Sequence, residues 1–241
     1  RLALMGASKT GKTWGAMTFP NPVVANFDNG LVAFYKRSDI TNVPFYDKAW
    51  IESWYKRSNE LPKTKFPAAP AFEEWLNIHG SKLESDQTLV IDSWTTLQDA
   101  FDQDYDEHPV ISRSTGKIDD FGKWDYKIDY SRNILAKCKS LKCHVVVLFH
   151  EQDNRDVNGQ VTGKIEPLMQ GKFQKKLGLY FTDFFRTITR AKLDPADKKK
   201  VIGAEYFWQT KSSDDCNLGS RFNLPMFCEP NFEVFKKAGG L

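Results

Sequence analysis

The sequence opens on a short apolar run that leads directly into a glycine-rich stretch, and this junction restricts the fold more than any other feature. Residues 2–5 read Leu-Ala-Leu-Met, and residues 6–13 read Gly-Ala-Ser-Lys-Thr-Gly-Lys-Thr. The second stretch matches the pattern G-x-x-x-x-G-K-[ST], in which a strand enters a tight turn and a helix leaves it. The pattern therefore predicts an α/β fold organised around an anion-binding turn.

Each position of this turn has a chemical role in holding a triphosphate. Gly6 and Gly11 allow the tight backbone path in which successive N–H groups converge on an anion. The helix that follows directs its positive end at the same phosphates. Lys12 adds a positive charge for the β- and γ-phosphates, and the Thr13 hydroxyl can bind Mg²⁺. The candidate nucleotide-binding residues are Gly6, Ala7, Ser8, Lys9, Thr10, Gly11, Lys12, Thr13 and Trp14.

Two further apolar runs, each expected to be a buried strand, end at an acidic residue. Residues 23–27 lead to Asp28, and residues 88–91 lead to Asp92. Ligands in open α/β sheets bind at the carboxyl ends of the strands. Asp92 is therefore expected to hold Mg²⁺ opposite Thr13, directly or through water. The alternative for Asp92 is an ordinary N-cap of the next helix.

The rest of the chain alternates between predicted strands and helices. Residues 143–150 are an apolar run that predicts a buried strand ending at His150, whereas the proline-punctuated residues 36–70 are expected to be irregular. Helices are predicted over residues 71–83, 94–105 and 123–141. This alternation predicts an α/β fold with a mostly parallel, twisted sheet and helices on both faces.

The second half of the chain adds antiparallel signals. Asn158-Gly159, with alternating flanks, predicts a hairpin turn. Residues 181–190 and 204–211 alternate in polarity and predict an antiparallel C-terminal edge. With 241 residues, of which 41% are hydrophobic, the chain can bury a sizeable core. We expect a single domain over residues 1–241, with its core at about residues 2–225.

Composition excludes several classes of protein. The net charge of +3 indicates no partner by itself. No run approaches the ~18 apolar residues of a membrane span, and no signal peptide is visible. The four cysteines form no C-x-x-C pair, so we expect reduced, buried thiols rather than a metal site. These features predict a cytoplasmic protein without a membrane partner.

Four stretches, taken together, carry a family resemblance. They are residues 6–13, residues 90–97 (Val-Ile-Asp-Ser-Trp-Thr-Thr-Leu), residues 148–151 (Leu-Phe-His-Glu) and residues 170–173 (Gln-Gly-Lys-Phe). Together they resemble the RecA-like P-loop ATPase core, most closely the compact RecA-like proteins of bacteriophages associated with single-strand annealing and recombination. The resemblance spans about residues 2–225.

The resemblance implies cofactors, partners and a location. The cofactors are ATP and Mg²⁺, and the main partner is single-stranded DNA. The protein would form a homo-oligomer, either a ring or a filament, with nucleotide at the subunit interfaces. A single-strand-binding protein is a further candidate partner. If the protein is phage-encoded, its location would be the host cytoplasm.

The resemblance also implies roles for the segment that follows the fourth core strand. His150 matches the polar residue that senses the γ-phosphate and passes its state to a DNA-binding loop. Residues 151–169 match that loop, and Arg155, Lys164 and Lys172 are candidate contacts for DNA phosphates. The alternative is a solvated hairpin whose acidic residues cancel its basic ones.

Candidate catalytic groups come from three places in the chain. RecA-like enzymes activate water with a glutamate just past the second strand, where this chain has Asp28, and Glu151 is a second candidate. AAA+ motors usually carry a glutamate directly after the strand-ending aspartate, but this chain has Ser93 there. Lys211 and Arg221 resemble cations that reach a neighbouring subunit's nucleotide, with ordinary surface cations as the alternative.

The function expected is ATP hydrolysis coupled to single-stranded DNA in phage recombination or replication. Two alternatives stay open at this stage. One is a small-molecule or nucleotide kinase with the same phosphate-binding turn. The other is an ATP-gated annealing or loading protein with little turnover, an alternative that Asp28 in place of a glutamate keeps open.

Overall fold

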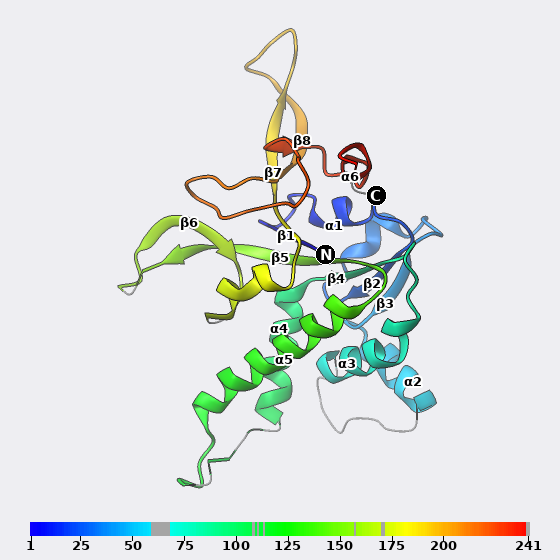
Figure 1. Ribbon diagram of the computed structural model, residues 1–241, viewed down its shortest axis with the longest axis vertical. Coiled ribbons are helices and arrows are strands. Elements are labelled where there is room, and N and C mark those ends of the chain that lie inside the picture. The colour runs from blue at the N-terminus through cyan, green and yellow to red at the C-terminus, as the bar shows by residue number, and fades with distance from the viewer. Residues whose placement is uncertain are drawn as a thin grey trace.

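A twisted sheet is the frame of the molecule (Figure 1). The computed structural model describes residues 1–58, 68–107, 109, 111–112, 114–156, 158–169 and 172–239. Within these residues the sheet has nine strands in the order β3-β2-β4-β5-β1-β7-β8-β9, with β6 paired to β5. The predicted α/β class, with a mostly parallel sheet and an antiparallel C-terminal edge, is confirmed.

The parallel part of the sheet consists of five neighbouring strands and the first strand of the antiparallel edge. Three of its strands are buried along their whole length, which explains why they are continuous apolar runs in the sequence. The strands are β1 (Leu2–Gly6), β2 (Pro22–Asn26), β3 (Thr41–Pro44), β4 (Thr88–Asp92), β5 (His144–Arg155) and β7 (Asp183–Leu193).

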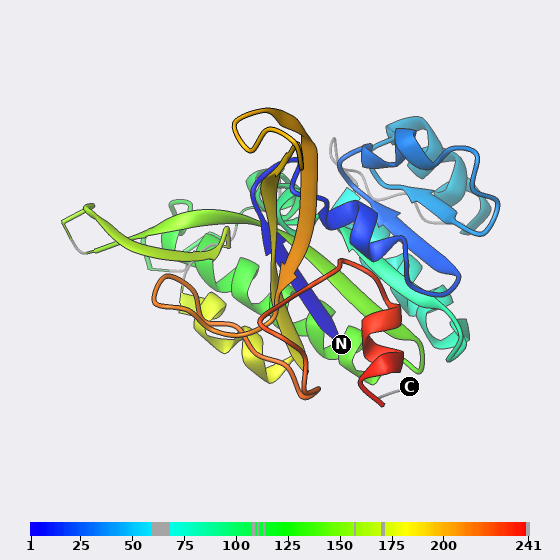
Figure 2. The same ribbon diagram turned by 90° about the horizontal axis from the view of Figure 1, so that it is seen from above.

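Helices cover both faces of this sheet. On one face, alternate residues such as Ala3 and Met5 pack with α2 (Lys48–Ser58), α3 (Ala68–His79), α4 (Trp94–Glu107), α5 (Asp120–Ser140) and the 3₁₀ helix η3 (Lys172–Leu179). On the other face, Leu2 and Leu4 pack with α1 (Lys12–Ala16), the 3₁₀ helix η1 (Gly30–Phe34) and α6 (Glu233–Lys237). Figure 2 shows α6 and α5 on opposite sides of the sheet. A short 3₁₀ helix, η2 (Gly80–Lys82), follows α3.

The prediction of an irregular segment over residues 36–70 is wrong for much of its length. Residues 41–44 form β3, which pairs in parallel with β2, and residues 48–58 form α2. The strand was missed because only Val43 of its four residues is buried. Asn42 anchors it instead, by accepting a 3.1 Å hydrogen bond from Asn26. Residues 59–67 lie outside the described part of the chain.

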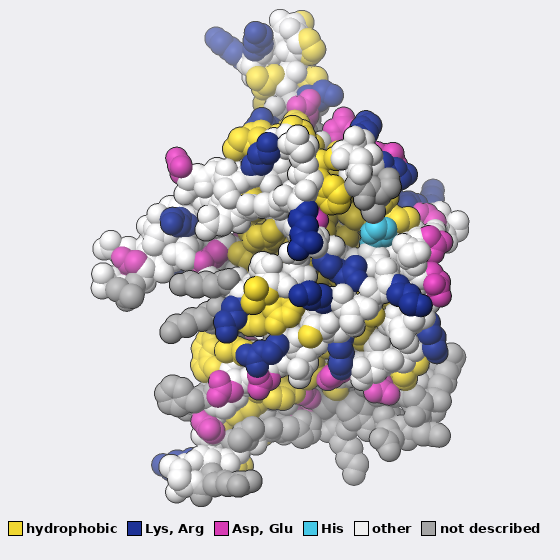
Figure 3. All heavy atoms as spheres, viewed as in Figure 1, with side chains coloured by type: hydrophobic (Ala, Val, Ile, Leu, Met, Phe, Trp, Pro, Cys, Tyr) yellow, Lys and Arg dark blue, Asp and Glu magenta, His cyan; other side chains and the backbone are white. Residues whose placement is uncertain are grey.

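Two antiparallel hairpins extend from the sheet. The first joins β5 to β6 (Val161–Pro167) and turns at Asn158-Gly159 as predicted, with Gly159 at φ 80°. The second joins β7 to β8 (Val201–Gln209), and β8 also pairs with β9 (Phe227–Cys228). The tip of the second hairpin projects at the top of Figure 3, where basic and hydrophobic side chains gather. Its exposed large apolar residues include Leu193, Val201 and Ile202.

The structure also bears on the expected free thiols and on the expected lack of a membrane-spanning segment. All four cysteines are free thiols, and Cys138, Cys143 and Cys216 are buried while Cys228 is half-buried. Among the described helices, none combines the length and the apolar character needed to cross a membrane.

Candidate nucleotide site

The glycine-rich turn connects the carboxyl end of β1 to α1. Gly6 has no space for a side chain, because a Cβ there would collide with the Thr187 hydroxyl. Gly11 has a φ of 87°, in the left-handed region that side chains disfavour, and it lies against the ring of Tyr206. Thr10 ties the turn to β7 through a 2.7 Å hydrogen bond with Thr187. The turn therefore has the backbone shape that the motif predicts.

Lys12 is buried beneath the turn rather than extended into solvent. Its Nζ donates hydrogen bonds to the carbonyl oxygens of Gly6 (2.8 Å) and Ala7 (2.7 Å). Burial lowers the pKa of Lys12, although the carboxylates of Asp92, Glu151 and Asp28 act in the opposite direction. To bind a phosphate, Lys12 has to exchange these two carbonyls for phosphate oxygens.

Thr13 and Asp92 form the candidate metal-binding pair. The Thr13 hydroxyl donates a 2.9 Å hydrogen bond to Oδ2 of Asp92, a residue that is 4% exposed. Burial is the main reason why the pKa of Asp92 is raised to about 6. A hydroxyl and a carboxylate are oxygen donors that Mg²⁺ prefers, and the cation would supply the positive charge that this buried carboxylate lacks. The residues present therefore fit Mg²⁺.

Asp28 forms a second carboxylate centre beside this pair. The Thr96 hydroxyl donates a hydrogen bond to Oδ1 of Asp28, and Nε2 of His150 lies 3.7 Å from Oδ2. Burial acts to raise the pKa of Asp28, but hydrogen bonds from His150, Thr96 and Ser93 outweigh it, so the pKa is lowered. Asp28 is therefore ionised at neutral pH and can accept a proton or a hydrogen bond from water.

The strand order explains why these residues meet. Strand β5 lies between β1 and β4, so His150 on β5 lies between the start of the phosphate-binding turn, at the end of β1, and Asp92, at the end of β4. His150 pairs in register with Gly6, and its backbone N–H donates a 3.1 Å hydrogen bond to the Thr95 hydroxyl. Sequence reasoning placed Asp92 and His150 at this edge of the sheet, and the structure brings both of them there.

A family model described as an AAA domain matches residues 1–221 of the chain. The chain belongs to this AAA domain family. Comparison with curated proteins gives no match. The family, the fold and the geometry of the turn agree on a P-loop ATPase domain of the AAA type, which binds and hydrolyses nucleotide. The finer resemblance to phage RecA-like proteins stays a prediction.

In this AAA domain the second candidate base, Glu151, is engaged by an arginine. Arg186 on β7 donates two hydrogen bonds to the Glu151 carboxylate, at 2.8 and 3.1 Å, and a third to Asp215 at 3.2 Å. The side chains of Glu151 and Arg186 are about equally buried, at 15% and 16% exposure. A bidentate pair of this kind fixes the carboxylate, so Asp28 is the better placed of the two bases.

Two of the three candidate DNA contacts lie on the β5–β6 hairpin. Arg155 and Lys164 are exposed, and Arg155 donates a 2.8 Å hydrogen bond to the carbonyl of Gly159 in the hairpin turn. Lys172 begins η3, and its side chain lies outside the described part of the structure. The structure thus places two of the three residues on one hairpin, and their contact with DNA stays a prediction.

Of the two candidate trans-acting cations, Arg221 lies away from the chain's own phosphate-binding turn. Lys211 is exposed two residues after β8. The backbone N–H of Arg221 donates a 3.2 Å hydrogen bond to Asp183, which pairs with Leu2 at the opposite end of β1 from the turn. A role for Arg221 at a nucleotide site would therefore require a neighbouring subunit, and the role of Lys211 stays a prediction.

Several contributors to the site were missed by sequence reasoning. Thr96 and Thr187 act through their hydroxyls, and Trp208 packs on Gly15, where a Cβ would lie 2.9 Å from the indole ring. Of these residues, only Thr96 could have been predicted from the sequence. It follows Asp92 by about one helical turn and so lies at the same edge of the sheet. The exposed ring of Trp14 contacts Phe34, with ring centroids 5.6 Å apart.

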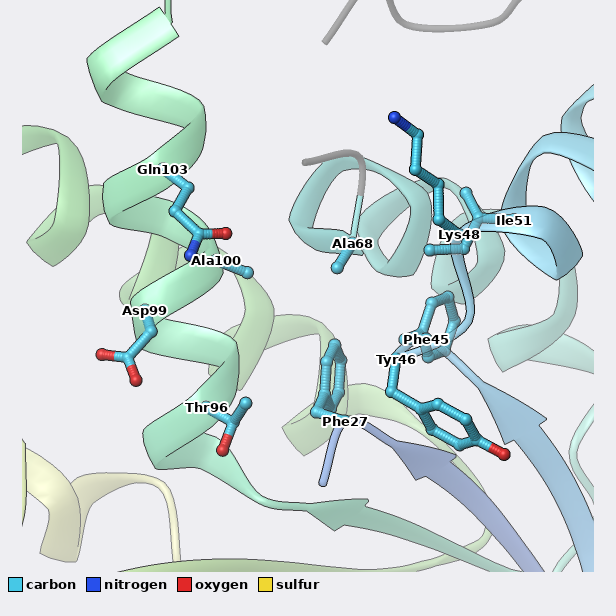
Figure 4. A pocket seen from close by; sticks show the side chains of 10 residues that line it. All are labelled: Phe27, Phe45, Tyr46, Lys48, Ile51, Ala68, Thr96, Asp99, Ala100 and Gln103. Atoms are coloured by element: carbon cyan, nitrogen blue, oxygen red, sulfur yellow. The ribbon is translucent and has the colours of Figure 1, made fainter. Parts of the chain in front are cut away.

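A cavity of about 650 Å³ reaches Thr96, the residue that donates a hydrogen bond to Asp28 (Figure 4). It lies between α4 on one side and the segment from β3 to α2 on the other, and it shares Thr96 with the Asp28 centre. The described residues that line it are Phe27, Phe45, Tyr46, Lys48, Ile51, Ala68, Thr96, Asp99, Ala100 and Gln103.

Proposed function

We propose that this AAA domain hydrolyses ATP with Asp28 as the residue that orients water, and that single-stranded DNA stimulates the reaction. The proposal rests on the position of Asp28, whose ionised carboxylate is held by Thr96 and His150 close to the Thr13–Asp92 pair. A carboxylate in hydrogen-bond reach of a water molecule can orient it and accept its proton.

In the proposed reaction, water attacks the γ-phosphorus in line with the oxygen that bridges to the β-phosphate. Asp28 accepts the proton of the water, the bond from the γ-phosphorus to the bridging oxygen breaks, and ADP leaves. Lys12 stabilises the charge on the transferred group after leaving the carbonyls of Gly6 and Ala7. Mg²⁺ at Thr13 and Asp92 would supply further positive charge to the phosphates.

Strand β5 supports the proposed coupling to DNA. It continues past His150 to Arg155 as one strand, with an irregularity in its pairing to β6 between Asp153 and Arg155, so the residue beside Asp28 and the hairpin share one strand. Arg155 and Lys164 would hold the DNA backbone without reading its sequence. In this proposal the γ-phosphate moves His150, and the strand carries the change to the hairpin.

The experiment measures ATP hydrolysis with and without a single-stranded oligonucleotide. Wild type is expected to be stimulated several-fold, and Lys12→Ala to lose about 100-fold or more of its turnover. The double variant Arg155→Ala/Lys164→Ala should lose stimulation, and its DNA affinity should depend less on salt, by a slope of about 0.7 for each lost phosphate contact. Lys237→Ala, an exposed lysine on α6, is the matched control.

The outcome that rejects the proposal is hydrolysis that neither DNA nor Lys12→Ala changes. Stimulation that survives in the Arg155→Ala/Lys164→Ala variant would reject the hairpin as the DNA-binding surface. Negligible phosphate release, together with DNA binding that still depends on ATP, would identify an ATP-gated binding protein instead.

We further propose that the domain acts as a homo-oligomer, in a ring or a filament, during phage recombination or replication. Lys211 and Arg221 would then approach the γ-phosphate of a neighbouring subunit, where a cation stabilises the transferring group. Mixing Arg221→Ala with Lys12→Ala subunits tests this, because each variant would supply what the other lacks. Partial recovery of hydrolysis is expected, and no recovery at any mixing ratio would reject a role in trans for Arg221.

The cavity beside Asp28 favours one other function, that of a P-loop kinase. A hydroxyl group held there would attack the γ-phosphorus, pass its proton to Asp28 and release ADP. The described part of the Lys192–Lys200 turn contains no arginine of the kind that covers the acceptor in such enzymes. Assays of phosphoryl transfer from ATP to nucleosides and nucleotides separate this function from hydrolysis.

A further inference from the structure

Asn26, the last residue of β2, carries a buried polar atom that is left unpaired. The residue is 0% exposed. Its amide nitrogen, Nδ2, donates a 3.1 Å hydrogen bond to Asn42 on β3, whereas its amide oxygen, Oδ1, has no hydrogen-bond partner among the described residues. An unpaired acceptor in the interior is costly and rare, and one explanation is a bound group that completes it.

Asn26 and Asp92 are neighbours on one face of the sheet. They are partners in the parallel pairing of β2 with β4, and neighbouring strands lie about 4.8 Å apart. Two residues earlier on each strand, Val24 and Val90 belong to the core cluster on the α1 side of the sheet. Because side chains on a strand alternate between the two faces, Asn26 and Asp92 also point to the α1 side. Thr13 bonds to Asp92 on that side.

The bond to Asn42 sets the direction of the unpaired oxygen. In the order of the sheet, β2 lies between β3 and β4. The nitrogen and the oxygen of an amide diverge from the same carbon, and here the nitrogen is directed at Asn42 on β3. Oδ1 is therefore turned away from β3, towards the side on which β4 carries Asp92.

The chemistry of Mg²⁺ gives this oxygen a partner. Mg²⁺ dehydrates reluctantly and usually keeps several water ligands in nucleotide sites. The hydrogens of such water molecules need acceptors, and groups in this outer layer fix the position of the metal. An amide oxygen accepts a hydrogen bond without adding charge, so it suits a place beside a buried carboxylate.

We propose that Asn26 is a positioning residue of the metal site, in which its Oδ1 accepts a hydrogen bond from a water molecule bound to Mg²⁺. This inference rests on the Thr13–Asp92 cation site of the proposed function, but neither on Asp28 as the base nor on DNA. Mutation of such an outer partner usually costs about 10- to 100-fold in metal affinity.

The test measures binding of a non-hydrolysable ATP analogue to the full chain by isothermal titration calorimetry over a series of Mg²⁺ concentrations. Wild type should bind more tightly as Mg²⁺ rises. Asn26→Leu keeps the branched shape of the side chain without its oxygen, and the Mg²⁺ concentration at half effect should rise about 10- to 100-fold. Asn26→Ala, which avoids the bulk of leucine, should show the same shift. Binding without Mg²⁺ should be unchanged in both variants.

A second measurement separates this role from a purely structural one. Asn26→Leu removes an unpaired buried oxygen and one hydrogen bond to the exposed Asn42. Urea unfolding without nucleotide should therefore show a stability no lower than that of wild type. Asn21→Gly is the matched control. It changes an exposed asparagine just before β2, at a φ of 41° that glycine adopts freely, so its Mg²⁺ dependence should equal that of wild type.

Three results would overturn the proposal. The first is a wild-type Mg²⁺ dependence in both Asn26→Leu and Asn26→Ala, whether or not their stability falls. The second is equal loss of analogue binding at every Mg²⁺ concentration, which would mean that Asn26 supports the phosphate-binding turn instead. The third is wild-type binding that Mg²⁺ does not affect. Hydrolysis that neither DNA nor Lys12→Ala changes would reject the proposed function and leave the Mg²⁺ shift of the Asn26 variants measurable.

Discussion

Thr13 and Asp92 are 79 positions apart in the chain, yet the threonine hydroxyl donates a 2.9 Å hydrogen bond to the aspartate carboxylate. The bond joins the first turn of α1 to the carboxyl end of β4, so the two oxygen donors are in place before any cation binds. It does not compensate fully for burial, because the pKa of Asp92 is still raised to about 6. The ionised form of Asp92 is therefore unfavourable in the free protein, and a bound cation would stabilise it.

Asp92→Asn should stabilise the protein in the absence of nucleotide. The pKa of Asp92 rises from 3.8 to about 6 on folding, so between these values the folded state binds more protons than the unfolded state. The free energy of unfolding therefore falls as pH rises through this window and stays low above it. Asparagine avoids that loss, which is worth at most about 3 kcal/mol.

Urea unfolding of wild type and Asp92→Asn at pH 8 and pH 4 checks this prediction. The variant should be the more stable at pH 8, and the difference should shrink towards pH 4. Nucleotide binding in the variant should no longer depend on Mg²⁺. Greater stability of wild type at pH 8 would show that the carboxylate is compensated in the free protein.

Asp28→Asn should lower catalytic activity, whereas Glu151→Gln should mainly lower stability. Asp28→Asn removes the proposed base and should lower kcat about 10²- to 10⁴-fold. Glu151→Gln removes a charge partner of Arg186, although Asp215 remains, and should cost about 1–3 kcal/mol of stability, with kcat changed only a few-fold. Steady-state kinetics and thermal unfolding of both variants check this prediction. A large loss of kcat in Glu151→Gln, with little loss in Asp28→Asn, would make Glu151 the base.

Gly15→Ala should destabilise the protein although alanine favours helices. The added Cβ would lie 2.9 Å from the buried indole of Trp208, and overpacking of this kind costs about 1–3 kcal/mol. Gly203→Ala, on β8, is the matched control, because nothing lies within 4 Å of its Cβ position. Equal melting temperatures of the two variants would mean that α1 can shift away from Trp208 freely.

His150→Ala should separate hydrolysis from its stimulation by DNA. The variant leaves Thr96 as the hydroxyl donor to Asp28, so basal hydrolysis should persist within about tenfold of wild type. The link from Asp28 to β5 is lost, so stimulation by single-stranded DNA should disappear. Parallel assays of both rates check the prediction, and stimulation that persists in His150→Ala would remove His150 from the proposed route.

The sequence was sufficient for the parts of the site that follow from local pattern. The phosphate-binding turn is one motif, and Asp28, Asp92 and His150 are polar residues at the ends of apolar runs, which a parallel sheet brings to one edge. The ion pair of Glu151 with Arg186 could not be foreseen in this way. It depends on β7 lying beside β1, which joins residues that have no pattern in common.

The segment between β2 and β4 shows a second limit of sequence reasoning. Strand β3 has one buried side chain, and its place is set by pairing with β2, so neither length nor periodicity identifies it. The cavity is a consequence of that segment, because α2 and Tyr46 form the wall opposite α4. A cavity whose walls come from elements as far apart in the chain as α2 and α4 becomes visible only when the chain is folded.

The contacts of β8 with α1 have a mechanical consequence. Trp208 fills the space at Gly15 and Tyr206 lies against Gly11, so the base of the projecting β7–β8 hairpin and the helix that carries Lys12 and Thr13 cannot move independently. Any molecule that tilts the hairpin on binding its tip must also shift the helix. By thermodynamic reciprocity, nucleotide would then alter affinity at the tip by the same factor with which the tip alters affinity for nucleotide.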